Sequence, residues 1–395
     1  MNESDQLAAP IQRQAGVGFA DFTVIRRFPK IAATAVASLQ GDPKVQCAIE
    51  TLVAQIIAGE RVDTSVMARP TPFWSRYLDG LAQATWAELP FFDIEFLFYH
   101  AMNSLAGHFD EGTDVFRIVR REAREVALEA LARASFDMKA GIAQAVWLAL
   151  LANEADYSQL VTGRGDASTW AERMVVDARP ELLAALANPV RVTAPIHLIA
   201  DNAGAELLAD LVLCDTLLAS SEKSHIVLHC KPWPMFVSDA LPEDVDGSID
   251  ALRAHTSSDL RALGLRLHEA RATNRLRVEN HVAWGEPRHF DALDAGLVDA
   301  LQTARVVIAK GDLNYRRFLG DRAWPAETPE SMASRTVPFV AFALRVLKSE
   351  TLVGVPSDVA TRAAAANPDW RTNGSYALVQ RLGHDHRAAN DAITE

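Results

Sequence analysis

The chain has 395 residues, of which 49% are hydrophobic, so it is long enough for two domains or one large elaborated domain. Its formal net charge of −12 argues against a nucleic-acid partner, because phosphate backbones bind basic surfaces. No apolar run reaches the roughly 20 residues of a membrane span, and three cysteines are too few for a disulfide framework. We therefore expect a globular, cytoplasmic protein with reduced thiols and no role at a membrane.

The first half of the chain has the periodicity of helices. Residues 1–18 lack a signal-peptide pattern and are predicted to form a flexible N-terminal tail. Residues 19–185 are predicted to form a helical domain, in which Glu95 stands inside an apolar, aromatic-rich helix. A buried carboxylate needs a partner, so Glu95 is a candidate to face a cleft. The predicted helices span residues 24–39, with an interruption at Pro29, and residues 43–59, 73–88, 91–105, 115–134 and 138–152.

The second half, residues 186–395, alternates short apolar runs with helical patterns. This alternation is typical of βαβ units in a parallel sheet, so we predict the α/β fold class for this domain. Polar residues directly follow several of the apolar runs, and the carboxyl ends of parallel strands are where such sheets bind ligands. The predicted strands span residues 196–200, 226–230, 276–278, 306–309, 339–344 and 376–379.

Asp201 and Asn202 immediately follow the first of these strands, and Asp239 ends the polar loop after the second. Carboxylate and amide oxygens are hard ligands of the kind that Mg²⁺ and Mn²⁺ prefer. The three side chains are therefore candidate ligands of one divalent cation. The alternative is that each polar cluster only caps the helix that follows it.

The loop after the strand at residues 306–309 combines basic and acidic residues. Lys310 and Arg316 could hold phosphate oxygens, and Gly311 permits a close approach of the backbone. Asp312 is a candidate base or nucleophile if it faces a phosphate ester. A surface turn with solvated charges is the alternative interpretation.

Two further groups of residues are weaker signals. Arg345 and Lys348, at the end of another predicted strand, could clamp the same anion or could form a solvated edge. His197, His225 and His229 lie in or beside strands without zinc-ligand spacing, and we interpret them as core or edge residues. The chain contains neither a Gly-x-Gly-x-x-Gly dinucleotide motif nor a Gly-x-Ser-x-Gly nucleophile motif.

Three motifs in the second half together resemble a known family. They are Asp-Asn-Ala-Gly-x-Glu at residues 201–206, Lys-x-x-Pro-Met-Phe-Val-Ser-Asp at residues 231–239, and Lys-Gly-Asp-Leu-Asn-Tyr-Arg at residues 310–316. These motifs are similar to those of the damage-control phosphatases, also named the acidic-residue methyltransferase-like family. The Gly-Asp-Arg-x-Trp stretch at residues 320–324 is similar to the sugar-phosphate branch of that family.

The resemblance extends to the first half, at residues 19–23, at Glu95 and at residues 153–158. It implies a Rossmann-like three-layer α/β/α core with a mostly helical N-terminal portion. It also implies a divalent metal ion (Mn²⁺, Mg²⁺, Co²⁺ or Ni²⁺) on Asp201, Asn202 and Asp239, and catalytic roles for Asp201 and Asp312. The implied substrate-binding residues are Glu95, Asn153, Asp201, Asn202, Glu206, Asp312, Leu313, Asn314, Tyr315, Arg316 and Lys348.

The implied function is that of a metal-dependent phosphatase. It would hydrolyse small sugar phosphates, of the fructose 1-phosphate or fructose 6-phosphate type, in metabolite damage control. Its partner would be a small phosphorylated metabolite, and no obligate protein partner is evident. The alternative is an S-adenosylmethionine-dependent protein-glutamate O-methyltransferase, although Asp201 and Asn202 stand where a glycine-rich cofactor loop would follow the first strand. A sugar-phosphate sensor without turnover is a third hypothesis.

Two positions depart from the pattern of the sugar-phosphate branch. Val346 replaces the threonine of an Arg-Thr-x-Lys motif, which removes a hydroxyl between Arg345 and Lys348. Residues 99–102 read Tyr-His-Ala-Met where relatives tend to have a basic pair. We expect these departures to affect substrate preference more than catalysis.

Overall fold

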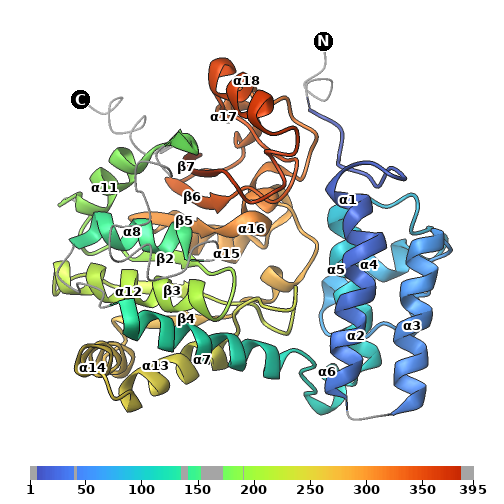
Figure 1. The fold of residues 1–395 in the computed structure, drawn as a ribbon, viewed down its shortest axis with the longest axis horizontal. Coiled ribbons are helices and arrows are strands. Elements are labelled where there is room, and N and C mark those ends of the chain that lie inside the picture. Colours follow the sequence, from blue (N-terminus) through green and yellow to red (C-terminus); the bar gives the residue numbers. More distant parts are fainter. Residues whose placement is uncertain (1–6, 40–41, 135–140, 153–171, 190, 384–395) are drawn as a thin grey trace.

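The computed structural model describes residues 7–39, 42–134, 141–152, 172–189 and 191–383 (Figure 1). The strands in these residues are β1 (Met174–Asp177), β2 (Ile196–Ile199), β3 (Ile226–His229), β4 (Leu276–Glu279), β5 (Val306–Lys310), β6 (Ala341–Val346) and β7 (Ala377–Leu382). They form one sheet in the order β1-β7-β6-β5-β2-β3-β4. Strands β2 to β6 run parallel to one another, whereas β7 pairs antiparallel with β6 and parallel with β1.

The strand order reverses between β2 and β5. From β2 the chain continues outward to β3 and β4, and it then crosses to β5 and β6 on the other side of β2. The two central strands pair in register up to their carboxyl ends, where Ile199 lies opposite Ala309. Such a reversal point is where open α/β sheets bind ligands. The loops after β2 and β5 therefore occupy the expected position for a site.

Helices cover both faces of the sheet, because successive residues of each strand point to opposite sides. Leu198 and Ile308 belong to the core of one face, and Ile199 and Ala309 to that of the other. In the described residues, no helix has both the length and the apolar run that a bilayer crossing needs. The first face is covered by α7 (Arg117–Ala134), α8 (Gly141–Leu151), α11 (Arg179–Ala187), α12 (Ala205–Ser220), α13 (Pro242–Ala254) and α14 (Ser258–Ala272), and the second by α15 (Ala295–Gln302), α16 (Gly311–Leu319) and α18 (Ser357–Ala366).

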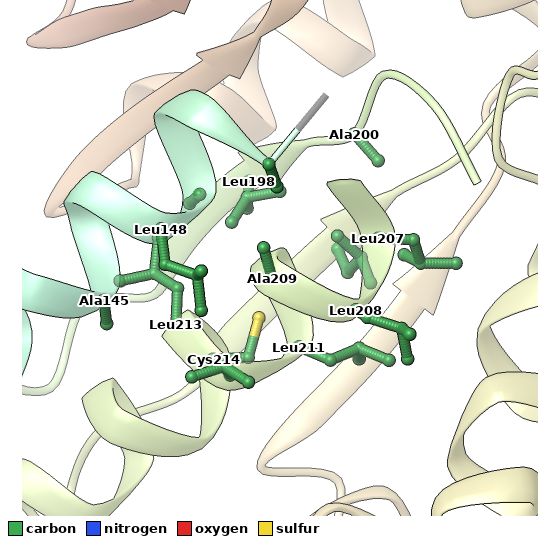
Figure 2. Close-up of a cluster of buried hydrophobic side chains, with 14 of the residues drawn as sticks. Ala145, Leu148, Leu198, Ala200, Leu207, Leu208, Ala209, Leu211, Leu213 and Cys214 are labelled. Atoms are coloured by element: carbon green, nitrogen blue, oxygen red, sulfur yellow. The ribbon is translucent and has the colours of Figure 1, made fainter. Parts of the chain in front are cut away.

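The core between the sheet and the first helical layer is made of aliphatic side chains. Figure 2 shows Ala145 and Leu148 of α8 beside Leu198 of β2 and the apolar residues of α12. Leu198 and Leu213 are fully buried there. The predicted three-layer α/β/α fold is therefore confirmed, and each of the six predicted strands is present.

The N-terminal part packs its helices around an aromatic core. Phe28 stacks on Phe98 with ring centroids 3.9 Å apart, and Trp74 stacks on His100 at 3.6 Å. Trp233, from the α/β part, belongs to the same core. The helices here are α1 (Gly18–Phe22), the π-helix η2 (Thr23–Arg27), α2 (Phe28–Ser38), α3 (Pro43–Ala58), η3 (Thr64–Val66), α4 (Pro72–Gly80), α5 (Phe91–Leu105) and α6 (His108–Glu111), and the later short elements are η4 (Val282–Gly285), η5 (Phe290–Ala292) and α17 (Glu330–Ala333).

The predicted interruption at Pro29 coincides with a change of helix type, because η2 ends at Arg27 and Pro29 lies in the first turn of α2, where a missing N–H is tolerated. Another predicted helix is too long. The helix predicted for residues 73–88 ends at Gly80. Beyond it the backbone pairs with another segment instead, since Trp86 N–H donates to the carbonyl of Glu60 at 2.8 Å.

The two predicted parts of the chain share elements across the predicted division near residue 185. Buried side chains of α7 and α8, such as Leu131 and Leu148, belong to the same core as α12. Strand β1 also precedes residue 185 and pairs with β7 at the edge of the sheet. As a domain boundary, residue 185 stays a prediction, but the layers of the α/β part begin at α7.

Residues 7–17, predicted as part of a flexible tail, make specific contacts. Ile11 N–H donates to the carbonyl of Asp321 at 3.0 Å, and Phe91 N–H donates to the carbonyl of Ile11 at 2.8 Å. Arg13 forms an ion pair with Asp21 at 2.8 Å. This segment therefore connects α5 with the chain that follows α16, which differs from the predicted tail.

His197 and His229 lie in the sheet as core residues, as predicted. The Nδ1 atom of His197 and the Nε2 atom of His229 are 2.8 Å apart, and Trp284 Nε1–H donates to His229 Nδ1 at 3.4 Å. Burial lowers the pKa of His197 to about 4, so both rings are neutral partners near pH 7.

Candidate active site

A cavity of about 750 Å³ opens at the carboxyl ends of β2 and β5. Its walls come from α1, η2, α5, α7, the loops after β2 and β3, α16, and the segment after β6. Elements far apart in the sequence therefore meet at the point where the strand order reverses. The predicted site residues that line this cavity are Glu95, Asp201, Asn202, Asp239, Asp312, Leu313, Arg316 and Lys348.

Backbone hydrogen bonds join the loop after β2 to the loop after β3. Ala240 N–H donates to the carbonyl of Asp201 at 2.8 Å, and Ala203 N–H donates to that of Ser238 at 2.6 Å. Just before this junction Phe236 and Val237 have φ values of 49° and 67°, a left-handed conformation that is strained for side chains of this kind. The bend brings Asp239 into an isolated bridge with Asn202.

Asn202 is oriented by bonds to its acidic neighbours. Its Nδ2 group donates to Asp201 Oδ2 at 2.8 Å and to Glu206 Oε2 at 2.6 Å. Its Oδ1 atom accepts a hydrogen bond from the hydroxyl of Ser238. Glu206 is buried and acts on the cavity through Asn202, since it is not among the described residues that line it.

Asp239 forms a buried ion pair with Lys231 from the same loop. The distance from Lys231 Nζ to Asp239 Oδ2 is 2.8 Å, and the two side chains are 3% and 2% exposed. Burial raises the pKa of Asp239 despite this partner, and burial together with Glu206 and Asp239 raises the pKa of Asp201 well above its ordinary value. The two aspartates are therefore crowded by negative charge.

These residues fit a divalent cation. The described part of the chain has no group of three or more His, Cys, Asp or Glu side chains arranged to hold a metal ion. The predicted ligands are instead two carboxylates and one amide, a set of hard oxygens suited to Mg²⁺ or Mn²⁺. Asp201, Glu206 and Asp239 carry three negative charges when ionised, and Lys231 offsets one. A divalent cation would balance the remaining two and relieve the crowding that raises the pKa values.

Gly311 lies directly against the carboxylate of Asp201. It has a φ of +79°, and a Cβ atom added there would lie 1.9 Å from Asp201 Oδ2. No residue with a side chain fits this position without displacing Asp201. The close approach of the backbone predicted for Gly311 is therefore confirmed, and the group approached is a proposed metal ligand.

Asp312 is held as a charged carboxylate. Arg345 Nε donates to Asp312 Oδ1 at 2.8 Å, and the backbone N–H of Lys348 donates to the same atom at 3.1 Å. Burial alone would raise the pKa of Asp312, but the guanidinium groups of Arg345 and Arg316 outweigh burial and lower it. Arg345 is fully buried by this contact, so the anion clamp predicted for the pair Arg345 and Lys348 is wrong for Arg345.

Glu95 and Arg316 form a second charged group in the cavity. Arg316 Nη1 lies 2.6 Å from Glu95 Oε2, and its Nε and Nη2 atoms donate to the two carboxylate oxygens of Asp321 at 2.8 and 2.9 Å. Burial raises the pKa of Glu95, whereas the Arg316 charge opposes that shift. Arg316 is thus occupied by two carboxylates, and its main effect is to fix Glu95 at the cavity wall.

Some predicted site residues point elsewhere. Lys310 forms a buried ion pair with Asp210 at 2.6 Å, and Asn314 donates to the carbonyls of Ala200 and Lys310. Tyr315 donates to Gln380 Oε1 at 2.7 Å. None of these three predicted residues is among the described residues that line the cavity. Asn153 lies outside the described residues.

The two departures from the family pattern also lie away from the cavity lining. Val346 is 7% exposed and packs in the apolar core on the first face of the sheet. His100 is buried, with Nε2 2.7 Å from the carbonyl of Ala68. Neither is among the described residues that line the cavity, so a direct effect of either on substrate preference has no support in the geometry.

The cavity is also lined by residues that were not predicted from the sequence. Arg27 and Arg133 bring positive charge to it, and Ala123 and Val126 of α7 add an apolar wall. Nothing in the local pattern of these residues marks them, because their position depends on how distant helices pack. The run at residues 19–23 was the one available signal, since Phe19 lines the same cavity.

Comparison with known proteins agrees with the motifs. The model of the damage-control phosphatase ARMT1-like domain matches residues 23–362. The damage-control phosphatase ARMT1 of Danio rerio is 36% identical over 191 residues, which cover 47% of this chain and 43% of that protein. The protein of the same name from Homo sapiens is 31% identical over 192 residues, 48% of this chain and 44% of that protein. Each match spans less than half of the relative's length.

A solved structure shares the fold. The crystal structure of a DUF89 family protein from Pyrococcus horikoshii superposes with a TM-score of 0.52 at 16% sequence identity. The superposition covers 91% of this chain and 98% of that one. At this level of identity the likeness concerns the fold alone.

Proposed function

The chain belongs to the damage-control phosphatase ARMT1-like family, and we propose that it is a metal-dependent phosphatase that hydrolyses small sugar phosphates. One observation carries the proposal. Two crowded, buried aspartates at the end of β2 and in the loop after β3 share a cavity with Asp312, a third aspartate that stays charged. Oxygen ligands for a cation beside an ionised carboxylate suit metal-dependent hydrolysis of a phosphate ester.

Asp201, Asn202 and Asp239 would hold the divalent cation. When bound, the cation would bind a phosphate oxygen and neutralise charge that develops in the transition state. Lys231 opposes the rise in the pKa of Asp239 and holds its carboxylate in place, and Gly311 leaves room for the Asp201 carboxylate. Glu206 fixes the amide of Asn202 through its hydrogen bond to Nδ2.

The remaining cavity residues would bind the phosphate and the sugar. Lys348 lines the cavity together with Asp201 and Asn202, so its ammonium group would bind phosphate oxygens beside the proposed metal. The start of α12 also faces the cavity at Ala203 and Ala205, and a helix N-terminus favours an anion. Asp312 would attack phosphorus or orient the attacking water, and Glu95 would accept hydrogen bonds from sugar hydroxyls.

A phosphate-release screen tests this function. The full-length protein with Mn²⁺ would be assayed against fructose 1-phosphate, fructose 6-phosphate, other hexose and pentose phosphates, and p-nitrophenyl phosphate. We expect release from the sugar phosphates, with the highest kcat/KM for one of the fructose phosphates. The proposal fails if no phosphate is released from any of them. Micromolar binding of S-adenosylmethionine in calorimetry, in place of turnover, would support the methyltransferase alternative.

A further inference from the structure

The N-terminal segment made of α1 and η2 brings a second arginine to the cavity. Phe19 and Arg27 line the cavity, although they precede the strands by about half of the chain. Arg27 is the last residue of η2, a π-helical turn between two α-helices. Single π-helical turns within α-helices are rare and occur frequently at functional sites. The position of Arg27 therefore results from an unusual backbone feature.

Glu350 attaches this segment to the loop that carries Lys348. The backbone N–H of Phe19 donates to Glu350 Oε1 at 2.6 Å. The N-cap residue of α1, Val17, provides no side-chain hydrogen bond, so the carboxylate of Glu350 satisfies the start of that helix instead. Because Glu350 is two residues from Lys348, this hydrogen bond connects the segment with Arg27 to another part of the cavity wall.

Arg27 differs from Arg316, the other arginine of the cavity wall near Glu95, in its ion pairs. Within the described residues, Arg316 is paired with Glu95 and Asp321, whereas Arg27 has no ion pair. Its guanidinium carbon lies over the ring of Phe19 at 5.3 Å from the ring centroid. Such stacking limits the rotamers of the arginine and leaves its N–H donors available to a ligand.

Arg27 lies close enough to Glu95 for its charge to act on that carboxyl group. After burial and Arg316, the Arg27 charge is a further influence on the pKa of Glu95, and it opposes the rise caused by burial. Arg27 and Glu95 also both line the cavity.

We propose that Arg27 determines specificity by recognising the sugar part of the substrate. The guanidinium donates hydrogen bonds to sugar oxygens, and the neighbouring Glu95 carboxylate accepts them from sugar hydroxyls. A donor fork beside a carboxylate matches a polyhydroxylated, uncharged leaving group better than a second anion, which the carboxylate would repel. The inference rests on the proposed phosphatase function and adds the residue that selects the leaving group.

The test compares two substrates that differ in the leaving group. Fructose 6-phosphate has hydroxyls for Arg27 to bind, and p-nitrophenyl phosphate has none. In Arg27→Met the ratio of kcat/KM for fructose 6-phosphate to that for p-nitrophenyl phosphate should fall by about 10- to 100-fold, the loss expected for hydrogen bonds to a charged donor. Arg27→Lys keeps the charge without the fork and should give an intermediate ratio.

Arg26→Met is the matched control. Arg26 lies in the same π-helical turn and is exposed, but it is not among the described residues that line the cavity, so the substrate ratio should stay at the wild-type value. An unchanged ratio in Arg27→Met would overturn the inference, and if kcat/KM fell equally for both substrates, Arg27 would be assigned to the phosphate instead. If the wild type releases phosphate from neither substrate, the proposed function itself fails.

Discussion

A Gly311→Ala variant should release phosphate from its sugar phosphate substrate roughly 100-fold or more slowly than the wild type, the loss expected for a catalytic group displaced by about 1 Å. The added methyl group would lie 1.9 Å from Asp201 Oδ2 and 2.2 Å from its Cγ atom. Either the aspartate or the loop after β5 must move, and both belong to the site. Steady-state kinetics with Mn²⁺ present would measure the effect.

The left-handed backbone at Gly311 would also reduce the stability of the Gly311→Ala variant. A control variant separates this loss of stability from the displacement of Asp201. Gly112 has a φ of +75° but no heavy atom within 4 Å of the position that its Cβ would take. Gly112→Ala should therefore lose only the roughly 1–2 kcal/mol of stability that the left-handed conformation costs, and kcat should not change. Wild-type kcat in Gly311→Ala would show that Asp201 can move without loss of catalysis.

An Asp201→Asn variant should lose phosphate release by roughly 1,000-fold or more, because a metal ion is worth several kcal/mol of transition-state stabilisation. The substitution keeps the shape of the side chain and removes one of the crowded negative charges that raise the pKa of this carboxyl. The metal-free protein should therefore be at least as stable as the wild type in urea unfolding at pH 7.

Asp239→Asn should lose activity to the same degree but should also destabilise the protein. Its carboxylate is the partner of the buried Lys231, and removing one member of a buried ion pair leaves the other unpaired. Asp250→Asn is a suitable control, since Asp250 pairs with Arg253 on the surface with 70% of its side chain exposed. Metal-dependent turnover at the wild-type rate in both site variants would contradict the assigned ligands.

The place of the site could be predicted from the sequence because it depends on the sheet. Parallel strands bring their carboxyl ends to one edge, so Asp201 after β2 and Asp312 after β5 had to lie close once the βαβ pattern was recognised. The antiparallel direction of β7 does not follow from this pattern. Strand β1 was not predicted, because it lies at the edge of the sheet and Val175 is its one fully buried residue.

The direction of each side chain after a strand could not be predicted in the same way. Residues 310–316 form a continuous motif, but they pass from a strand into α16, so neighbours in the sequence face different sides. Asp312 and Arg316 reach the cavity, whereas Lys310 and Tyr315 bond to Asp210 and Gln380. A motif match therefore identifies a loop more reliably than it identifies the contacts of each residue.

The cavity walls from the first half of the chain depend on tertiary packing. Arg27 reaches the site because a π-helical turn and the contact between Phe19 and Glu350 position its helix. Such a contact between residues 331 positions apart has no local signature. The same holds for α7, whose charged, amphipathic sequence reads as a surface helix although Ala123 and Val126 line the cavity.

Restoration of activity by metal after chelation tests whether a cation on Asp201, Asn202 and Asp239 is needed for turnover. The full-length wild-type protein would be stripped with a chelator, and Mn²⁺, Mg²⁺, Co²⁺ or Ni²⁺ would be added back singly with fructose 6-phosphate as substrate. We expect the stripped protein to be inactive, at least one of these ions to restore phosphate release, and none to restore it in Asp201→Asn. Full phosphate release by the stripped protein, or equal restoration in Asp201→Asn, would contradict a catalytic metal on Asp201, Asn202 and Asp239.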